Sequence, residues 1–127
     1  MRCYIHAYGV SRQFGDFNPL HVDEVFAERS QFGSRILHGP FTSALASAPV
    51  GMFFAGSAIA YLEHACRFKA PVRAGDTLAT EWTVREKLDK PRHKGGIVVM
   101  RGVCANQHGD VVLEADGKIL VASRPAG

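Results

Sequence analysis

Two side chains that could share a proton lie on either side of an Asn-Pro turn near the start of the chain. Asp16 and His21 are five residues apart, with Asn18 and Pro19 between them. In an unbroken helix these side chains would point in different directions, but proline forces the preceding residue out of the helical region and so favours a turn. Such a turn can bring a carboxylate and an imidazole to one pocket, where they could hold one water molecule for acid–base chemistry.

A purely structural interpretation of the same residues stays open. Asp and Asn are favoured at helix caps, so Asp16 or Asn18 could simply cap a short helix expected around residues 22–26, with Asp23 and Glu24 in its first turn. His21 would then pack against that helix. The choice between the two interpretations depends on what else lies nearby.

A second segment favours the chemical interpretation. Gly39 fits a helix cap and Pro40 fits the first helical position, where the missing N–H of proline costs nothing. We therefore expect a long helix over residues 40–55, slender because it is rich in Ala and Gly, which Pro49 kinks or ends early. The free N–H groups at its start would stabilise an oxyanion, with His38 as a structural hydrogen-bonding residue beside them. An oxyanion site near an acid–base pair is typical of a reaction centre.

The remainder of the chain predicts strands. Residues 57–68, 77–88, 97–105 and 111–122 have strand character and are separated by turns, two of them short enough for antiparallel hairpins. Gly117 within the last strand suggests a bulge, and we expect Trp82 and Cys104 to be packing residues. One slender helix followed by a four-strand meander predicts an α+β fold in which a sheet wraps around a helix. No repeat or linker divides the chain, so we expect one domain over residues 1–127.

Composition and charge exclude several classes of function. The chain is 46% hydrophobic and 21% charged, as in an ordinary globular protein. Its net charge of +3 is scattered, which argues against nucleic acid but suits an anionic, phosphorylated ligand. The most apolar window, residues 44–62, is broken by Ser, Pro and Gly and does not predict a membrane span.

The cysteines and histidines predict neither disulfides nor a metal site. The three cysteines have no C-x-x-C spacing, and the N-terminus has no apolar secretory stretch, so we expect a protein of the reducing cytoplasm. The histidines outside the two segments above have no ligand spacing. A basic loop at residues 92–94 either touches the phosphates of a ligand or is a solvated hairpin tip.

Several segments resemble the MaoC-like, (R)-specific enoyl-CoA hydratase family. They are residues 15–21 (GDFNPLH), 26–27 (FA), 36–39 (ILHG), 67–78 (RFKAPVRAGDTL) and 106–112 (NQHGDVV), and they occur in the family's order. The similarity covers about residues 8–122, and the first segment is the most specific.

The resemblance implies a hotdog fold, an antiparallel sheet curled round a long central helix. It implies that Asp16 and His21 bind and activate water, that the Gly39 amide forms the oxyanion hole, and that Asn18 and Ser47 contact the substrate. The implied reaction is reversible addition of water to a trans-2-enoyl thioester of coenzyme A or acyl carrier protein, giving the (R)-3-hydroxyacyl thioester. It requires no metal or redox cofactor. The implied assembly is a homodimer or a dimer of dimers that joins sheets edge to edge.

The chain also departs from the family pattern, and two alternative functions stay open. The family usually has a strand before the first helix, whereas only fifteen residues precede Asp16, so we expect that edge strand to be absent or replaced. Phe14 stands where a small residue is common. The alternatives are a hotdog acyl-CoA thioesterase and a non-catalytic, acyl-thioester-binding partner subunit of a heteromeric hydratase.

Overall fold

Helices fill the first half of the chain and strands the second, as the sequence predicts. The computed structural model describes residues 7–124. Its elements are α1 (Ala7–Phe14), α2 (Pro19–Val22), α3 (Glu24–Glu28), α4 (Gly39–Phe53), β1 (Ala58–Phe68), β2 (Ala79–Lys90), the 3-10 helix η1 (Pro91–His93), β3 (Gly95–Ala105) and β4 (Val111–Ala122). Within this part of the chain, no strand precedes α4, and no helix is both long and apolar enough to cross a membrane.

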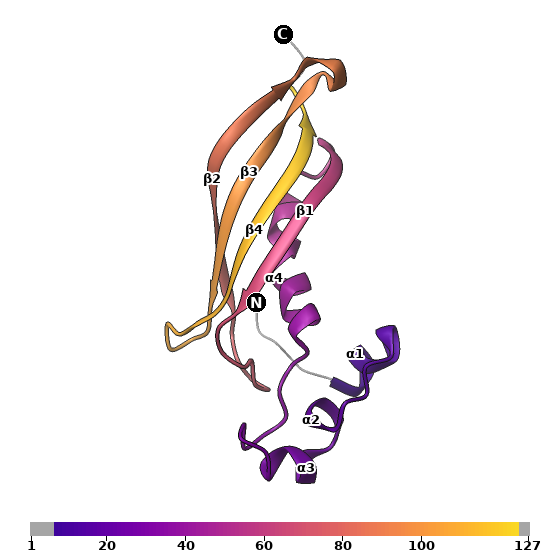
Figure 1. Ribbon diagram of the computed structural model, residues 1–127, viewed down its shortest axis with the longest axis vertical. Helices are drawn as coiled ribbons and strands as arrows, with labels where there is room; N and C mark the ends of the chain where they lie inside the picture. Colours follow the sequence, from indigo (N-terminus) through magenta and orange to yellow (C-terminus); the bar gives the residue numbers. More distant parts are fainter. Residues whose placement is uncertain (1–6, 125–127) are drawn as a thin grey trace.

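The four strands form one antiparallel sheet in the order β1-β4-β3-β2 (Figure 1). The last three strands are joined by hairpins, but β1 pairs with β4 and not with β2. The expected meander is therefore wrong for β1. The physical reason lies in residues 69–78, which cross from one edge of the sheet to the other and bury Val72 and Leu78 in the core on the way.

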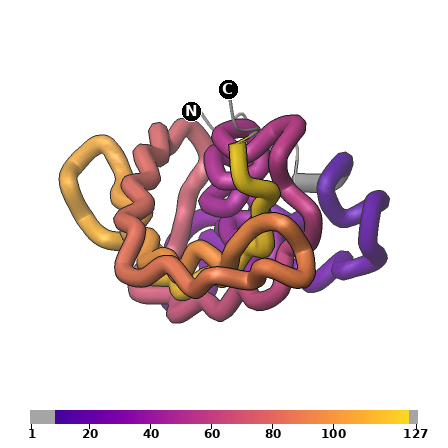
Figure 2. The backbone as a smooth tube through the Cα atoms, turned by 90° about the horizontal axis from the view of Figure 1, so that it is seen from above, coloured from indigo at the N-terminus to yellow at the C-terminus, as the bar shows by residue number. Residues whose placement is uncertain are grey.

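Helix α4 packs against the concave face of this sheet. Its buried residues, Thr42, Ala46 and Val50, recur at intervals of four and so lie on one side of the helix. Alternate residues of β3, such as Met100 and Cys104, are buried on the facing side of the sheet, which confirms Cys104 as a core residue. Seen from above, the strands curve around α4 (Figure 2). This is the expected α+β hotdog architecture.

The limits of α4 differ from those expected. The helix begins at Gly39, with His38 as its N-cap, and ends at Phe53. It also continues past Pro49, so an end at that proline is wrong, while the alternative effect, a kink, stays a prediction. Proline removes a single backbone hydrogen bond in the helix interior, whereas Val50, one residue later, is almost fully buried and holds the following turn against the sheet.

The expected helix around residues 22–26 is divided in two. Asp23 has an extended backbone, with φ of −116° and ψ of 105°, and it ends α2. Its carboxylate accepts a hydrogen bond from the N–H of Phe26 at 3.1 Å and so caps α3. Asp23 is thus a cap and not a first-turn residue, and Glu24 alone takes the place beside the positive helix end.

Gly117 does not form the predicted bulge. Its pairing is regular, and the two irregularities of the β1–β4 pairing lie in β1, between Ala58 and Ala60 and between Tyr61 and Glu63. A Cβ on Gly117 would lie 3.4 Å from the Tyr61 hydroxyl and 3.5 Å from the Trp82 ring, which are ordinary contact distances. Packing therefore does not require glycine at this position.

Trp82 is confirmed as a packing residue that joins α4 to the sheet. Its indole Nε1 donates a hydrogen bond to the Ala46 carbonyl at 2.8 Å, and its ring contacts both clusters of buried residues. Gly102 lies under the ring, where a Cβ would come within 2.8 Å of three ring carbons. Because the indole is held by its hydrogen bond, it has little freedom to move away.

We expect Gly102→Ala to lower the free energy of unfolding by about 1–3 kcal/mol, since overpacking displaces the fixed indole. Gly51→Ala is the matched control. Gly51 lies inside α4 with open space around it, so alanine should stabilise the helix by about 0.5–1 kcal/mol. Urea denaturation followed by circular dichroism measures both, and unchanged stability of Gly102→Ala would contradict the placement of Trp82.

Candidate active site

Two successive side-chain hydrogen bonds reverse the chain between α1 and α2. Gly15 ends α1 with a left-handed φ of 86°, and its N–H donates to the Ser11 carbonyl at 2.7 Å. The carboxylate Oδ1 of Asp16 then accepts from the N–H of Asn18 at 3.1 Å, and the Asn18 Oδ1 accepts from the N–H of Leu20 at 3.0 Å. Asp and Asn favour such turns because their short side chains bond to the backbone two residues on.

This reversal brings Asp16 and His21 together. The Nδ1 of His21 lies 2.8 Å from the Ile36 carbonyl, which can only accept, so Nδ1 carries a proton. In the neutral ring Nε2 then has a free lone pair. This Nε2 is 3.8 Å from Oδ2 of Asp16, too far for a direct hydrogen bond but close enough for one water to bridge.

The two members of the pair differ in exposure. The His21 side chain is 12% exposed and the Asp16 side chain 44%. The imidazole is therefore held in place, while the carboxylate can be reached from solvent. The structural interpretation is confirmed in part, because Asn18 caps a helix, although that helix is α2 and not the one after Val22. The chemical interpretation stays a prediction.

His38 contacts both members of the pair. It is fully buried, and its Nε2 lies 3.0 Å from both the Ser11 hydroxyl and the Asp16 main-chain carbonyl. Since a carbonyl only accepts, Nε2 donates and holds the backbone of Asp16. The ring also stacks on that of His21, with centroids 3.8 Å apart. The expectation that His38 is a structural hydrogen-bonding residue is confirmed.

Ser11 was not anticipated from the sequence. It is fully buried in α1 and is hydrogen-bonded to His38, which lies 27 residues later in the sequence. A serine in a short amphipathic helix carries no local signal of such a long-range contact. Only the packing of α1 against the loop before α4 makes it part of the site.

Three of these side chains are close enough to share an ion. Asp16, His21 and His38 each offer one ligand atom, and these atoms lie within 4.8 Å of one another. Imidazole and carboxylate ligands suit transition metals. One ring nitrogen of each histidine is engaged by a main-chain carbonyl, which leaves the other ring nitrogen able to face an ion. That the protein needs no metal stays a prediction.

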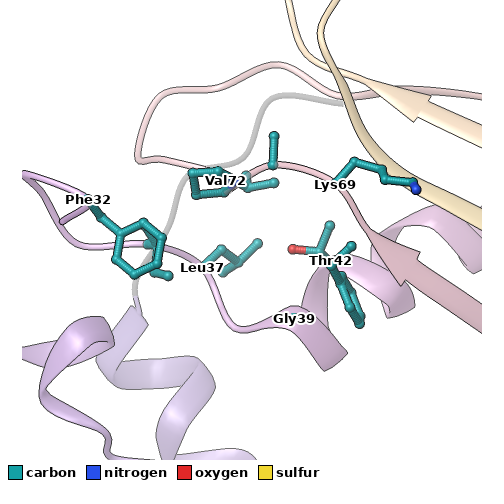
Figure 3. Close-up of a pocket in the computed structure, with 10 residues that line it drawn as sticks. Phe32, Leu37, Gly39, Thr42, Lys69 and Val72 are labelled. Carbon is teal, nitrogen blue, oxygen red and sulfur yellow. The ribbon is translucent and has the colours of Figure 1, made fainter.

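Gly39 lies beside a cavity of about 290 Å³. The cavity is lined by Phe32, Ile36, Leu37, Gly39, Thr42, Phe68, Lys69, Ala70, Pro71 and Val72, with Phe32 and Lys69 at opposite ends (Figure 3). Gly39 opens α4, so its N–H has no partner within the helix. A Cβ at this position would lie 3.4 Å from the Phe68 ring, so Gly39 packs directly beside that ring. Ile36 connects this cavity to the pair, because its carbonyl holds His21.

Comparison with known proteins decides the family. The family model described as the MaoC like domain matches residues 10–106, most of the chain. This chain belongs to the MaoC-like domain family. The resemblance seen in the sequence motifs is thereby confirmed.

The relatives are named hydratases and dehydratases. A 3-hydroxybutyryl-CoA dehydratase of Methylorubrum extorquens is 37% identical over 113 residues, 89% of this chain and 68% of the relative. An (R)-specific enoyl-CoA hydratase of Rhodospirillum rubrum is 34% identical over 109 residues, 86% and 72% of the two chains. The solved structure of unliganded R-hydratase PhaJ1 from Pseudomonas aeruginosa superposes with a TM-score of 0.80 at 33% identity, over 93% of this chain and 73% of that one. These relatives place the protein in a family of hydro-lyases with the hotdog fold.

The remaining expected residues of this MaoC-like domain lie apart from the pair. Ser47 is eight residues beyond Gly39, about 12 Å farther along α4, and its hydroxyl donates to the Ala44 carbonyl. The basic loop at residues 92–94 lies at the end of the sheet opposite to α1, α2 and the start of α4 (Figure 1). Within one chain, this loop is an exposed hairpin tip and not part of the candidate site.

Proposed function

We propose that this MaoC-like domain is an (R)-specific enoyl-CoA hydratase, which adds water reversibly to trans-2-enoyl thioesters to give (R)-3-hydroxyacyl thioesters. The observation that carries the proposal is the 3.8 Å separation of Asp16 Oδ2 and His21 Nε2. Each residue has its other polar atom fixed by the backbone, so these two atoms are left to hold one water. The names of the relatives agree with this chemistry.

In this mechanism the pair handles one proton of the water. Asp16 Oδ2 accepts the proton as the water oxygen attacks the β-carbon of the substrate. His21 orients the water through Nε2 and shares in proton delivery, because the proton taken up by Asp16 passes by way of Nε2 to the α-carbon. The second proton of the water stays in the new hydroxyl group, so the elements of one water molecule are added across the double bond.

The Gly39 N–H stabilises the negative charge that develops on the thioester oxygen during this addition. It stands at the first turn of α4, where the helix dipole is positive and no intrahelical acceptor competes. The mostly apolar cavity beside it excludes water from the thioester. We also propose that Asn18 borders the substrate at the turn and that Ser47 borders the acyl chain farther along α4.

The substrate is carried by coenzyme A, with acyl carrier protein as the alternative carrier. No metal or redox cofactor enters the proposed steps.

We place the protein in the cytoplasm, since Cys66 and Cys104 are free thiols and a reducing compartment keeps them so.

We expect Asp16→Asn and His21→Ala each to lower hydratase turnover at least about 100-fold, because each removes a positioned acid–base group. His93→Ala, at the exposed hairpin tip, is the matched control and should keep normal turnover. Circular dichroism checks that all three variants fold. Near-normal turnover in a folded Asp16 or His21 variant would remove the proposed pair.

The reaction itself is tested by following two signals in one sample of the purified chain. Loss of enoyl absorbance reports hydration of a 2-enoyl-CoA, and release of free thiol reports hydrolysis. We expect hydration to be faster and the product to be the (R)-3-hydroxyacyl thioester. Faster thiol release would instead favour a hotdog thioesterase, an (S) product would contradict the assignment, and inactivity with both substrate classes would favour a non-catalytic partner subunit.

We further propose that the chain forms a homodimer or a dimer of dimers. Within residues 7–124, both outer strands have unpaired edges, β1 on one side and β2 on the other. They expose apolar side chains such as Ile59, Leu62 and Val84. Edge-to-edge pairing would cover them. Light scattering at micromolar concentration should give at least the dimer mass, and a fully active monomer would contradict the proposal.

A further inference from the structure

A second cluster of reactive side chains lies between α4 and β1, outside the candidate active site. Ser43 Oγ is 2.8 Å from His64 Nε2 and 3.4 Å from Cys66 Sγ, and the last two atoms are 3.2 Å apart. His64 and Cys66 are two residues apart on β1 and so share one face of the strand. Both side chains point toward the helix that carries Ser43. The proposed hydratase reaction uses none of these groups.

The imidazole in this cluster is held from both sides. The Tyr61 hydroxyl lies 3.3 Å from Nδ1 of His64, and its ring meets the imidazole edge to face. Burial, and then the charge of a Cys66 thiolate, raise the pKa of Tyr61, so the phenol stays neutral. When the Nδ1 proton points to Tyr61, the lone pair of Nε2 faces both the Ser43 hydroxyl and the Cys66 sulfur. A thiol beside an imidazole that a third group orients is the arrangement of an activated nucleophile.

Two groups beside this imidazole could act as a nucleophile, the Ser43 hydroxyl and the Cys66 sulfur. The sulfur is the better nucleophile of the two. A thiol is partly ionised at neutral pH even when it is free, whereas a serine hydroxyl is not. Acyl transfer to either group would also need donors aimed at an oxyanion. Thiol–disulfide exchange needs only a thiolate and an accessible sulfur, and Cys66 is partly exposed.

We propose that Cys66 is a reversible modification site that takes low-molecular-weight disulfides. His64 accepts the thiol proton, and the thiolate attacks one sulfur of the disulfide. A bond forms between Cys66 and that sulfur while the disulfide bond breaks, and the departing thiolate takes the proton from His64. Cys66 is thereby oxidised to a mixed disulfide, and the other half of the reagent is reduced to a thiol.

The attached group would lie close to the candidate oxyanion turn. Ser43 is one turn of α4 from Gly39, about 6 Å along the axis. Phe68, which packs on Gly39, lies two residues beyond Cys66 on the same face of β1. A mixed disulfide at Cys66 therefore inhibits the hydratase reaction. This inhibitory consequence rests on the proposed function, whereas the modification itself does not.

The chain offers a matched control in Cys104, which is fully buried in the core. The test uses the full chain carrying Cys3→Ser, because Cys3 lies outside the described residues. After incubation with oxidised glutathione at pH 7, intact-mass and peptide mass spectrometry should show one addition, at Cys66, which dithiothreitol reverses. The addition should persist in Cys104→Ser and vanish in Cys66→Ser. A folded His64→Gln variant should react about 10-fold more slowly, because its thiol has lost the proton acceptor.

Reaction of Cys66 only after unfolding in urea, or an unchanged rate in His64→Gln, would overturn the proposal. Turnover is measured on the same samples and should fall about 10-fold on modification and return with dithiothreitol. Undiminished turnover of the modified protein would overturn the inhibitory consequence. A chain that hydrates enoyl-CoA but takes no glutathione contradicts this inference alone, and one that takes glutathione without hydrating contradicts the proposed function alone.

Discussion

The buried imidazole of His38 is the contact on which the arrangement of the site depends. Its Nε2 joins α1, through Ser11, to the main chain of Asp16, and its ring supports His21 by stacking. The same residue is the N-cap of α4, directly before Gly39. One side chain therefore fixes the carboxylate, the imidazole and the helix start relative to one another. Breaking a buried hydrogen bond costs free energy, so any displacement of α1 or of the turn is opposed by the loss of these contacts of His38 Nε2.

Preorganisation of the pair also requires that α4 sit close to the sheet. Small residues on the inner face of the helix, Ala46 above all, leave its carbonyl open to the indole of Trp82. Gly102 in turn lets that indole lie flat on β3. The helix start is thereby held against Phe68 with no side chain at position 39. Positioning of this kind lowers the entropy that a reaction must lose in its transition state, and here it depends on packing far from the reacting groups.

The parts of the site that the sequence predicts are those set by local chemistry. The convergence of Asp16 and His21 follows from an Asx-type turn and a proline, both of which act over two or three residues. The start of α4 follows from proline at its second position. The placement of β1 beside β4, the contact of Ser11 with His38 and the Ser43–His64 hydrogen bond could not be predicted, because each joins segments far apart in the chain. The prediction of Asp23 as a first-turn residue was wrong for a local reason. Aspartate is favoured both at the N-cap and in the first turn of a helix, so the sequence does not distinguish the two positions.

The topology also explains why both reactive clusters lie toward one end of the sheet. The chain enters α4 at Gly39 and returns along β1, so the end of that strand meets the start of the helix. His64 and Cys66 precede Phe68 on β1 and thus face the second turn of α4, while the segment before α4 carries the Asp16 contacts. The opposite end of the sheet holds the η1 hairpin tip and the turn between α4 and β1. Because a helix start exposes unpaired N–H groups, this is the end at which the backbone itself supplies polar donors, and side chains placed there by strand pairing can act beside them.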